Sequence, residues 1–142
     1  MMQVKDVMTP DPMAVGVACS LRRALTALHE LHVRYLPVIG EGNVLVGMVT
    51  DRELGHAPGK PASDEVAVSS RLQLDDPVAK IMSAMPDAVN VHADVQAAVD
   101  LMLAHKIAAV PVVDEDGRLV GMVSYLDLLR ERLPRRGAGR RR

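Results

Sequence analysis

Aromatic side chains and cysteines are the two residue classes that this sequence almost lacks. Its 142 residues include two tyrosines, no phenylalanine and no tryptophan. The core must therefore consist of aliphatic residues and methionine, and a flat ligand could stack only on Tyr35 or Tyr125. The single cysteine, Cys19, excludes an intramolecular disulfide and a Cys-x-x-Cys metal site. We expect a reducing compartment and a cytoplasmic location.

Long apolar runs are also missing. No stretch approaches the ~20 apolar residues of a membrane helix, so we expect no membrane partner. The first residues carry charges and prolines where a secretory signal would have an apolar run. The hydrophobic fraction of 49% is nevertheless sufficient for a packed core.

Positive charge is concentrated at the C-terminal end. The formal net charge is −1, yet the last eight residues include the five arginines Arg135, Arg136, Arg140, Arg141 and Arg142. We expect a solvated basic tail, because such a segment cannot contribute to a core. Contact with nucleic acid or an acidic partner is the alternative, and the acidic remainder of the chain argues against nucleic acid.

The chain repeats itself at a fixed offset of 74 residues. Val4 corresponds to Val78, and the register holds without a gap as far as Leu54 and Leu128. The identical positions, numbered in the first copy, are Val4, Met8, Pro12, Ala14, Val15, Val17, Ala24, Pro37, Val38, Glu41, Leu45, Val46, Gly47, Met48, Val49 and Leu54. Chance does not produce this register, so the chain is a tandem repeat. One copy of ~50 residues exposes too much apolar surface to be stable alone, and we expect two copies to pack together.

Each copy predicts the element order βαββα. In the first copy an apolar run (14–17) precedes a helix after the N-cap candidate Ser20, and a strand (36–39), a turn (41–43) and a second strand (44–49) follow. The corresponding elements of the second copy are 88–91, a helix after Asp94, 110–113, 115–117 and 119–123. The second helices are predicted to start at Thr50 and Ser124.

Prolines mark further boundaries. Pro37 and Pro111 lack a ladder donor, which predicts that their strands lie at a sheet edge or start at the proline. Asp75 or Asp76 before Pro77 predicts an N-cap and a helix that runs to Met82. The predicted organisation is a first unit at 1–54, a linker at 55–77, a second unit at 78–130 and the basic tail at 131–142.

The repeat resembles the CBS domain family. Each copy has an apolar-Pro-Val step, a Val-Gly-Met-Val strand and a hydroxyl-x-x-acid element, in this order and at equal spacing. The segments are Leu36-Pro37-Val38 with Thr50-Asp51-Arg52-Glu53, and Val110-Pro111-Val112 with Ser124-Tyr125-Leu126-Asp127. The resemblance implies an α/β (α+β) fold of two βαββα units with pseudo-two-fold symmetry, known as a Bateman module, and a homodimer. It also implies a regulatory protein and not an enzyme.

Members of the family bind adenosine-containing ligands between the two units. The resemblance therefore implies AMP, ADP, ATP or S-adenosylmethionine as a regulatory ligand and no required cofactor. A hydroxyl at a helix start can bind phosphate beside the helix N–H groups, and an acid three residues later can accept hydrogen bonds from ribose. We expect Ser124 and Asp127 to act in this way, followed by Thr50 and Glu53. A capping box, which satisfies only the backbone, is the alternative for both pairs.

The residues before the middle strand complete the expected site. Arg34 matches the position where nucleotide-binding relatives often carry a basic side chain that reaches the phosphate of the ligand. Alternatively, Arg34 is simply a solvent-exposed residue. Tyr35 could cover the base or pack on the linker, and the second copy has Ala108 and Ala109 there instead. The remaining expected ligand-binding residues are Val89, Ala109 and Pro111.

No other pattern indicates chemistry. His29 and His32 lie one helical turn apart, but no third metal ligand follows by spacing, so we expect no metal site. Nucleophile motifs and phosphate-binding glycine loops are missing from the sequence. Two alternatives to the nucleotide sensor stay open: a ligand-free structural or interaction dimer, and a nucleic-acid-associated protein that acts through its arginine tail.

Overall fold

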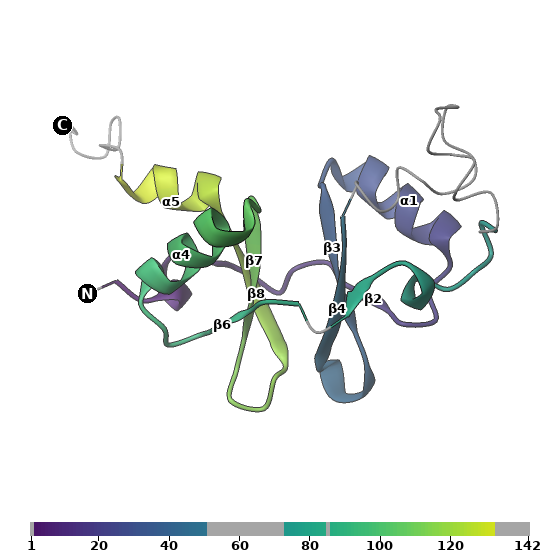
Figure 1. Cartoon of the computed structure of the whole chain (residues 1–142), viewed down its shortest axis with the longest axis horizontal. Helices are drawn as coiled ribbons and strands as arrows, with labels where there is room; N and C mark the ends of the chain where they lie inside the picture. The colour runs from purple at the N-terminus through teal and green to yellow at the C-terminus, as the bar shows by residue number, and fades with distance from the viewer. Residues whose placement is uncertain (1, 51–72, 85, 133–142) are drawn as a thin grey trace. The chain divides into compact units, whose positions relative to one another are not determined.

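The chain folds into two compact units, each with its own four-stranded sheet (Figure 1). The computed structural model describes residues 2–50, 73–84 and 86–132. The α1 unit comprises Met13–Pro86, and the α4 unit comprises Met1–Pro12 together with Asp87–Arg142. Two separate sheets agree with two units and exclude one continuous sheet through both copies.

The α1 unit contains β2 and one long helix before its central hairpin. Its elements are β2 (Val15–Gly16), α1 (Leu21–Leu31), β3 (Tyr35–Ile39), the 3-10 turn η2 (Glu41–Asn43), β4 (Leu45–Thr50), η3 (Val78–Lys80) and β5 (Ser83–Ala84). The strand order is β2-β3-β4-β5. The pair β2 and β3 is parallel, and the other pairs are antiparallel.

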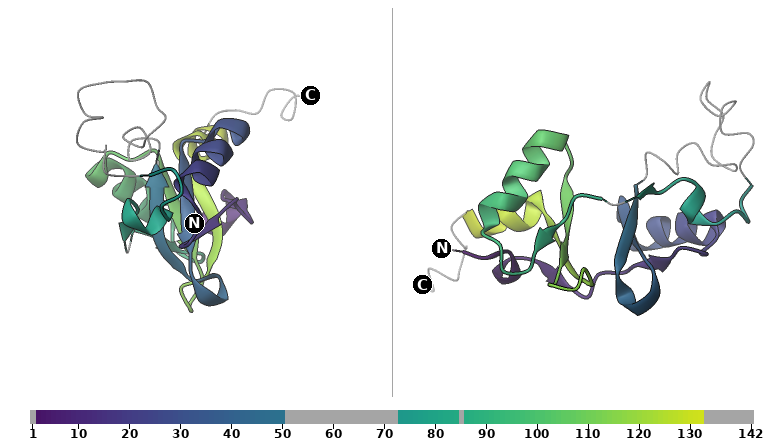
Figure 2. Two further views of the ribbon diagram at one scale, coloured as in Figure 1. Left: turned by 90° about the vertical axis from the view of Figure 1, so that its right-hand side faces the viewer. Right: turned by 60° about the horizontal axis from the view of Figure 1, so that its bottom comes forward.

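The α4 unit has the same plan. Its elements are η1 (Val4–Asp6), β1 (Thr9–Pro10), β6 (Val89–Asn90), α4 (Val95–His105), β7 (Ala109–Val113), β8 (Leu119–Ser124) and α5 (Tyr125–Arg132). Its strand order is β1-β8-β7-β6. Figures 1 and 2 show α4 and α5 on the same face of this sheet.

The two copies of the repeat exchange their leading segments. The Val4 N–H of the first copy donates to Ala93 O of the second at 2.8 Å, and the Val78 N–H of the second copy donates to Cys19 O of the first at 2.7 Å. Strand β1 accordingly pairs with β8, and β5 pairs with β4. Each compact unit therefore consists of most of one copy and the first residues of the other, and its bounds differ from those of the sequence repeat.

Both cores are aliphatic, as the composition predicts. In the α1 unit the buried cluster is Leu21, Ala24, Leu28, Leu36, Val38, Val49 and Val78. In the α4 unit it is Val4, Val7, Val89, Ala98, Met102, Val110, Val112, Val123 and Leu128. The exchanged residues Val4 and Val78 are completely buried, so each leading segment is part of the partner copy's core.

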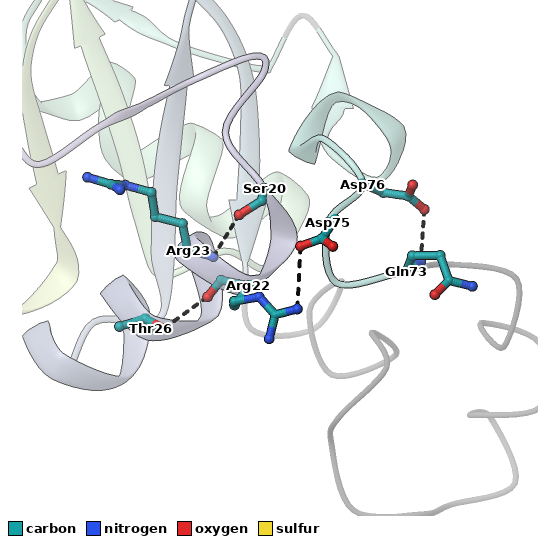
Figure 3. Close-up of polar contacts among 7 residues, drawn as sticks. All are labelled: Ser20, Arg22, Arg23, Thr26, Gln73, Asp75 and Asp76. Atoms are coloured by element: carbon teal, nitrogen blue, oxygen red, sulfur yellow. Dashed lines mark hydrogen bonds and ion pairs between the residues drawn. The ribbon is translucent and has the colours of Figure 1, made fainter.

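The predicted helix starts at Ser20 and Asp94 are confirmed. Ser20 Oγ accepts from the Arg23 N–H at 3.1 Å, and Asp94 Oδ1 accepts from the Gln96 N–H at 2.8 Å. The first two N–H groups of α1 donate to the segment just before Val78: Leu21 N–H donates to Asp76 O, and Arg22 N–H donates to Leu74 O. Figure 3 shows the side-chain contacts around them, among them the Ser20 cap and the ion pair of Arg22 with Asp75. A helix start leaves such donors without an intrahelical acceptor, so these contacts also fix the exchanged segment.

The prediction that the strands of Pro37 and Pro111 lie at a sheet edge or start at the proline is wrong, because β3 begins at Tyr35 and β7 at Ala109. Strands β3 and β7 each lie between two neighbours. The parallel neighbour β2 pairs only with Val38 and Ile39, so the ladder on that side begins after the proline. The missing N–H of proline is therefore compatible with an inner strand.

The helix predicted after Asp75 or Asp76 is reduced to the 3-10 turn η3. Its N-cap is Pro77, without a side-chain cap. The Asp76 carboxylate instead accepts from the Gln73 N–H at 2.8 Å. The backbone N–H of Gln73 and the Lys80 ammonium 3.5 Å away together lower the pKa of Asp76.

Candidate functional site

The end of β8 and the start of α5 bring Ser124 and Asp127 together. Ser124 is the last residue of the strand, and Asp127 lies in the first turn of the helix. Asp127 Oδ2 accepts from the Ser124 N–H at 2.9 Å, and Ser124 Oγ accepts from the Asp127 N–H at 3.2 Å. This reciprocal pair is a capping box, the alternative that the sequence leaves open.

A third residue, Arg130, completes this group. Its Nη1 lies 3.0 Å from Asp127 Oδ1, so both carboxylate oxygens have a protein donor. The Asp127 side chain is only 11% exposed, whereas that of Arg130 is 72% exposed. Sequence analysis did not single out Arg130, although its place three residues after an acid in a predicted helix is a signal for an ion pair.

Asp127 and Ser124 still have hydrogen-bonding capacity that the capping box and the ion pair do not use, so they can also bind a ligand. A carboxylate has roughly four lone-pair sites, and the capping bond and the ion pair use two of them. A hydroxyl that accepts one bond, as Ser124 Oγ does, can still donate its own hydrogen. The capping box and a role in ligand binding are therefore chemically compatible.

The other expected residues of the second copy divide into two groups. Ala109 lies directly across the β7–β8 ladder from Ser124 and is half-buried. Val89 and Pro111 are buried instead, Val89 within the core cluster of the α4 unit. Ala109 is thus the expected residue that the structure places beside Ser124.

The first copy repeats part of this arrangement. Thr50 ends β4 and pairs across the ladder with Tyr35, as Ser124 pairs with Ala109. Arg34 is exposed directly before β3, and Tyr35 is half-buried. Glu53 lies outside the described residues.

A hollow of about 260 Å³ lies elsewhere in the α4 unit. Its lining residues are Met2, Val7, Asp94, Val95, Gln96, Leu128 and Glu131. It includes none of the expected ligand-binding residues, and its volume is below the ~300–1,000 Å³ typical of ligand sites.

Metal and thiol chemistry find little support in the described part of the chain. Over residues 2–50, 73–84 and 86–132, no group of three or more His, Cys, Asp or Glu side chains is arranged to hold a metal ion. His32 is the left-handed C-cap of α1. Burial raises the pKa of Cys19, which keeps its thiol protonated at neutral pH. No helix in the same ranges is long and apolar enough to cross a membrane.

Comparison with known proteins identifies the family. The CBS domain family model matches residues 4–58 and 78–134. This chain belongs to the CBS domain family. A CBS domain-containing protein of Dictyostelium discoideum is 33% identical over 129 residues, a match that covers 89% of this chain and 88% of that relative. The match therefore spans most of the length of this relative.

Two solved structures share the fold. A CBS-pair protein named CBSX2, crystallised in complex with AMP, has a TM-score of 0.79 and 30% identity, and the match covers 93% of this chain and 96% of that one. The CBS domain pair of protein MJ0100, crystallised with 5-methylthioadenosine and S-adenosyl-L-methionine, has a TM-score of 0.74, with 92% of this chain and 95% of that one covered. Its 24% identity supports the CBS-pair fold alone.

Proposed function

We propose that this chain is a cytoplasmic regulatory CBS-pair module, not an enzyme, that binds an adenosine-containing ligand. The observation that carries the proposal is the group of Ser124 and Asp127 at the start of α5, in a chain 30% identical to a CBS pair crystallised with AMP. The ligand class is AMP, ADP, ATP or S-adenosylmethionine. The ligand acts as an effector, and no cofactor is required.

The Asp127 carboxylate is the proposed ribose acceptor. The capping bond from Ser124 and the ion pair with Arg130 fix both of its oxygens before any ligand arrives. A fixed acceptor loses little rotamer entropy on binding, which favours affinity. Ser124 Oγ remains a donor for phosphate, and Ala109 across the ladder leaves space instead of charge.

The first copy is proposed as the second ligand position. Thr50 and Tyr35 face each other across the β3–β4 ladder, and Arg34 is exposed beside them. The acid of this copy is Glu53, which is one methylene longer than aspartate and is less suited to the same ribose geometry. We therefore assign the tighter position to the second copy.

The test compares the two acids. Asp127→Ala should weaken adenine-nucleotide binding by about 1.5–3 kcal/mol, the range for a hydrogen bond to a charged group. Glu53→Ala should change the affinity less. Titration calorimetry gives the affinity, and thermal melting of the same variants separates it from loss of the cap, which costs ~1 kcal/mol of stability. If Glu53→Ala alone abolished binding, the assigned position would be the wrong one.

A second candidate role, an interaction dimer, is favoured by exposed apolar side chains on α4 and α5. Leu103 is 73% exposed, and Tyr125, Leu126 and Leu129 are about half exposed. The position of α1 that corresponds to Leu103 carries His29. We propose that these apolar side chains pair with those of a second copy, because exposed apolar patches are typical of interfaces.

Ultracentrifugation tests the dimer with a matched pair of variants. On the two long helices, Leu28 and Met102 are buried core residues, whereas Leu31 and Leu103 are exposed. Leu103→Arg should shift the protein toward the 15.3 kDa monomer, whereas His29→Arg should not. A wild-type protein that is monomeric at micromolar concentration would contradict the proposal.

A further inference from the structure

Arg130 is the cationic side chain in contact with Asp127. It lies on α5, its guanidinium is largely exposed, and its Nη1 is 3.0 Å from Asp127 Oδ1. A guanidinium carries five N–H donors in a planar fork that suits phosphate, and this ion pair occupies Nη1 alone. The same carboxylate bonds to the Ser124 N–H through its other oxygen. The guanidinium and the start of α5 therefore lie on two sides of one carboxylate.

Most of the backbone N–H donors at the start of α5 that could bind an anion already have a protein acceptor. The Ser124 N–H donates to Asp127 Oδ2, the Tyr125 N–H donates to Ala108 O at 2.9 Å, and the Asp127 N–H donates to Ser124 Oγ. Three of the donors that could cradle phosphate at a helix start already have protein acceptors. A phosphate at this position therefore depends on side-chain donors, namely the Ser124 hydroxyl and any cation close to it.

The residues that differ between the copies point to the same requirement. At the position before the middle strand, the first copy has Arg34, whereas the second has Ala108. One turn after the acid the difference is reversed, because Arg130 of the second copy corresponds to His56 of the first. The second copy thus carries a permanent cation one turn after its acid, where the first copy has a histidine.

We propose that Arg130 binds the phosphate of the ligand and makes the Asp127 position selective for phosphorylated adenosine ligands over adenosine and S-adenosylmethionine. This inference rests on the proposed function, since it assigns the ligand class of the same position. Asp127 holds the guanidinium beside the ribose, and the remaining donors of Arg130 meet the phosphate. S-adenosylmethionine has no phosphate, and its sulfonium and ammonium charges offset its single carboxylate, so it gains less from this arginine than a phosphorylated ligand does.

The experiment is a calorimetric titration of the full chain with three probes: AMP, adenosine and S-adenosylmethionine. Arg130→Ala should weaken AMP roughly tenfold, the size of one charge-assisted hydrogen bond, and change adenosine less than about twofold. Arg130→Lys should restore part of the AMP affinity. Arg118→Ala is the matched control, because Arg118 is an exposed arginine of the same unit whose ion pair with Asp116 lies on the β7–β8 turn.

Each remaining outcome overturns the inference in a recognisable way. Equal weakening of AMP and adenosine by Arg130→Ala would make Arg130 a residue that only orients Asp127. Unchanged or tighter binding of AMP to Arg130→Ala would show that Arg130 does not bind the phosphate. In that case Arg130 would compete with the ribose for the Asp127 carboxylate. If wild-type protein binds none of the three probes, or Asp127→Ala leaves all of them unchanged, the proposed function fails first and the inference fails with it. Thermal melting of every variant separates these results from loss of folding.

Discussion

Two glycines show at the residue scale how closely the exchanged segments pack. A Cβ added to Gly121 would clash with Met8 Sδ, and a Cβ added to Gly47 would clash with Met82 Sδ. Both pairs follow the 74-residue register, and in each pair the methionine belongs to the other copy. These glycines are needed for close approach, because any side chain would displace the methionine of the exchanged segment.

Gly121→Ala should therefore destabilise the α4 unit by about 1–3 kcal/mol, the usual range for overpacking. Chemical denaturation measures this change. Gly16→Ala is the control, because the atom nearest to its added Cβ is a carbonyl oxygen at an ordinary 4.0 Å. In the double variant Met8→Ala, Gly121→Ala, the two costs should be less than additive. Full additivity would show that the two residues do not interact.

Asp76 gives a pH-dependent prediction at the same scale. Its pKa is lowered by the Gln73 N–H and by Lys80, so the folded state favours the carboxylate. The resulting stability is fully present above the ordinary pKa of 3.8 and is lost as the pH falls through the lower value of the folded state. Asp76→Asn should be less stable than wild type at pH 7, and this difference should shrink below about pH 4. A difference that is independent of pH would contradict the assigned cause.

Helix caps are the elements that the sequence specifies best. Ser20 and Asp94 stand before apolar residues at helical spacing, and their side chains make the expected bonds to backbone N–H groups. Capping depends on a residue type and its distance from a few neighbours, so it can be predicted without tertiary information. The turn at Glu41–Asn43 was also predictable, since Gly42 adopts the positive φ of 70° that favours glycine.

Asp94→Ala should accordingly lower the stability by ~1 kcal/mol, with a range of 0.5–2. Asp94→Ser keeps an acceptor and should recover most of this loss. Thermal melting of both variants and of wild type measures this change. All samples must have the same protein concentration, because the melting temperature of a dimer depends on concentration. An alanine variant as stable as wild type would show that the Gln96 N–H finds another acceptor.

Contacts between residues far apart in the sequence could not be predicted from local patterns. The Ser124-x-x-Asp127 pair was visible as a spacing, but the same spacing describes both a cap and a ligand site. The inner position of β3 depends on how far β2 reaches along it, which no pattern within β3 encodes. Residues 73–77 resemble a helix start, yet the backbone of Asp76 serves the start of α1 instead.

At the scale of the whole molecule, the exchange of leading segments couples the two copies. Val4 belongs to the first copy but is completely buried in the core of the α4 unit, and Val78 has the reverse relation to the α1 unit. Neither copy of the sequence repeat contains all of one core. The repeat predicts two similar units, but it does not predict that each unit is composed of both copies.

Amide hydrogen exchange measured on core variants tests whether the leading segments are exchanged between the two copies. Val4→Ala should cost about 2 kcal/mol through lost burial and a small cavity. The protection lost should lie in α4, β7 and β8 and not in α1, β3 and β4, although Val4 precedes α1 in the sequence. Val78→Ala should give the opposite pattern. Loss of protection in α1 on mutation of Val4 would contradict the observed unit composition.

The most direct test of the account is a calorimetric titration of the wild-type chain with AMP. The proposed function predicts a saturable heat, together with an increase in melting temperature that grows with AMP concentration, because a ligand that binds only the folded state stabilises it by mass action. At about 100 times its Kd the ligand should add ~2.7 kcal/mol of stability. No heat and no thermal shift at millimolar AMP, ATP or S-adenosylmethionine would contradict the sensor and leave the interaction dimer in its place.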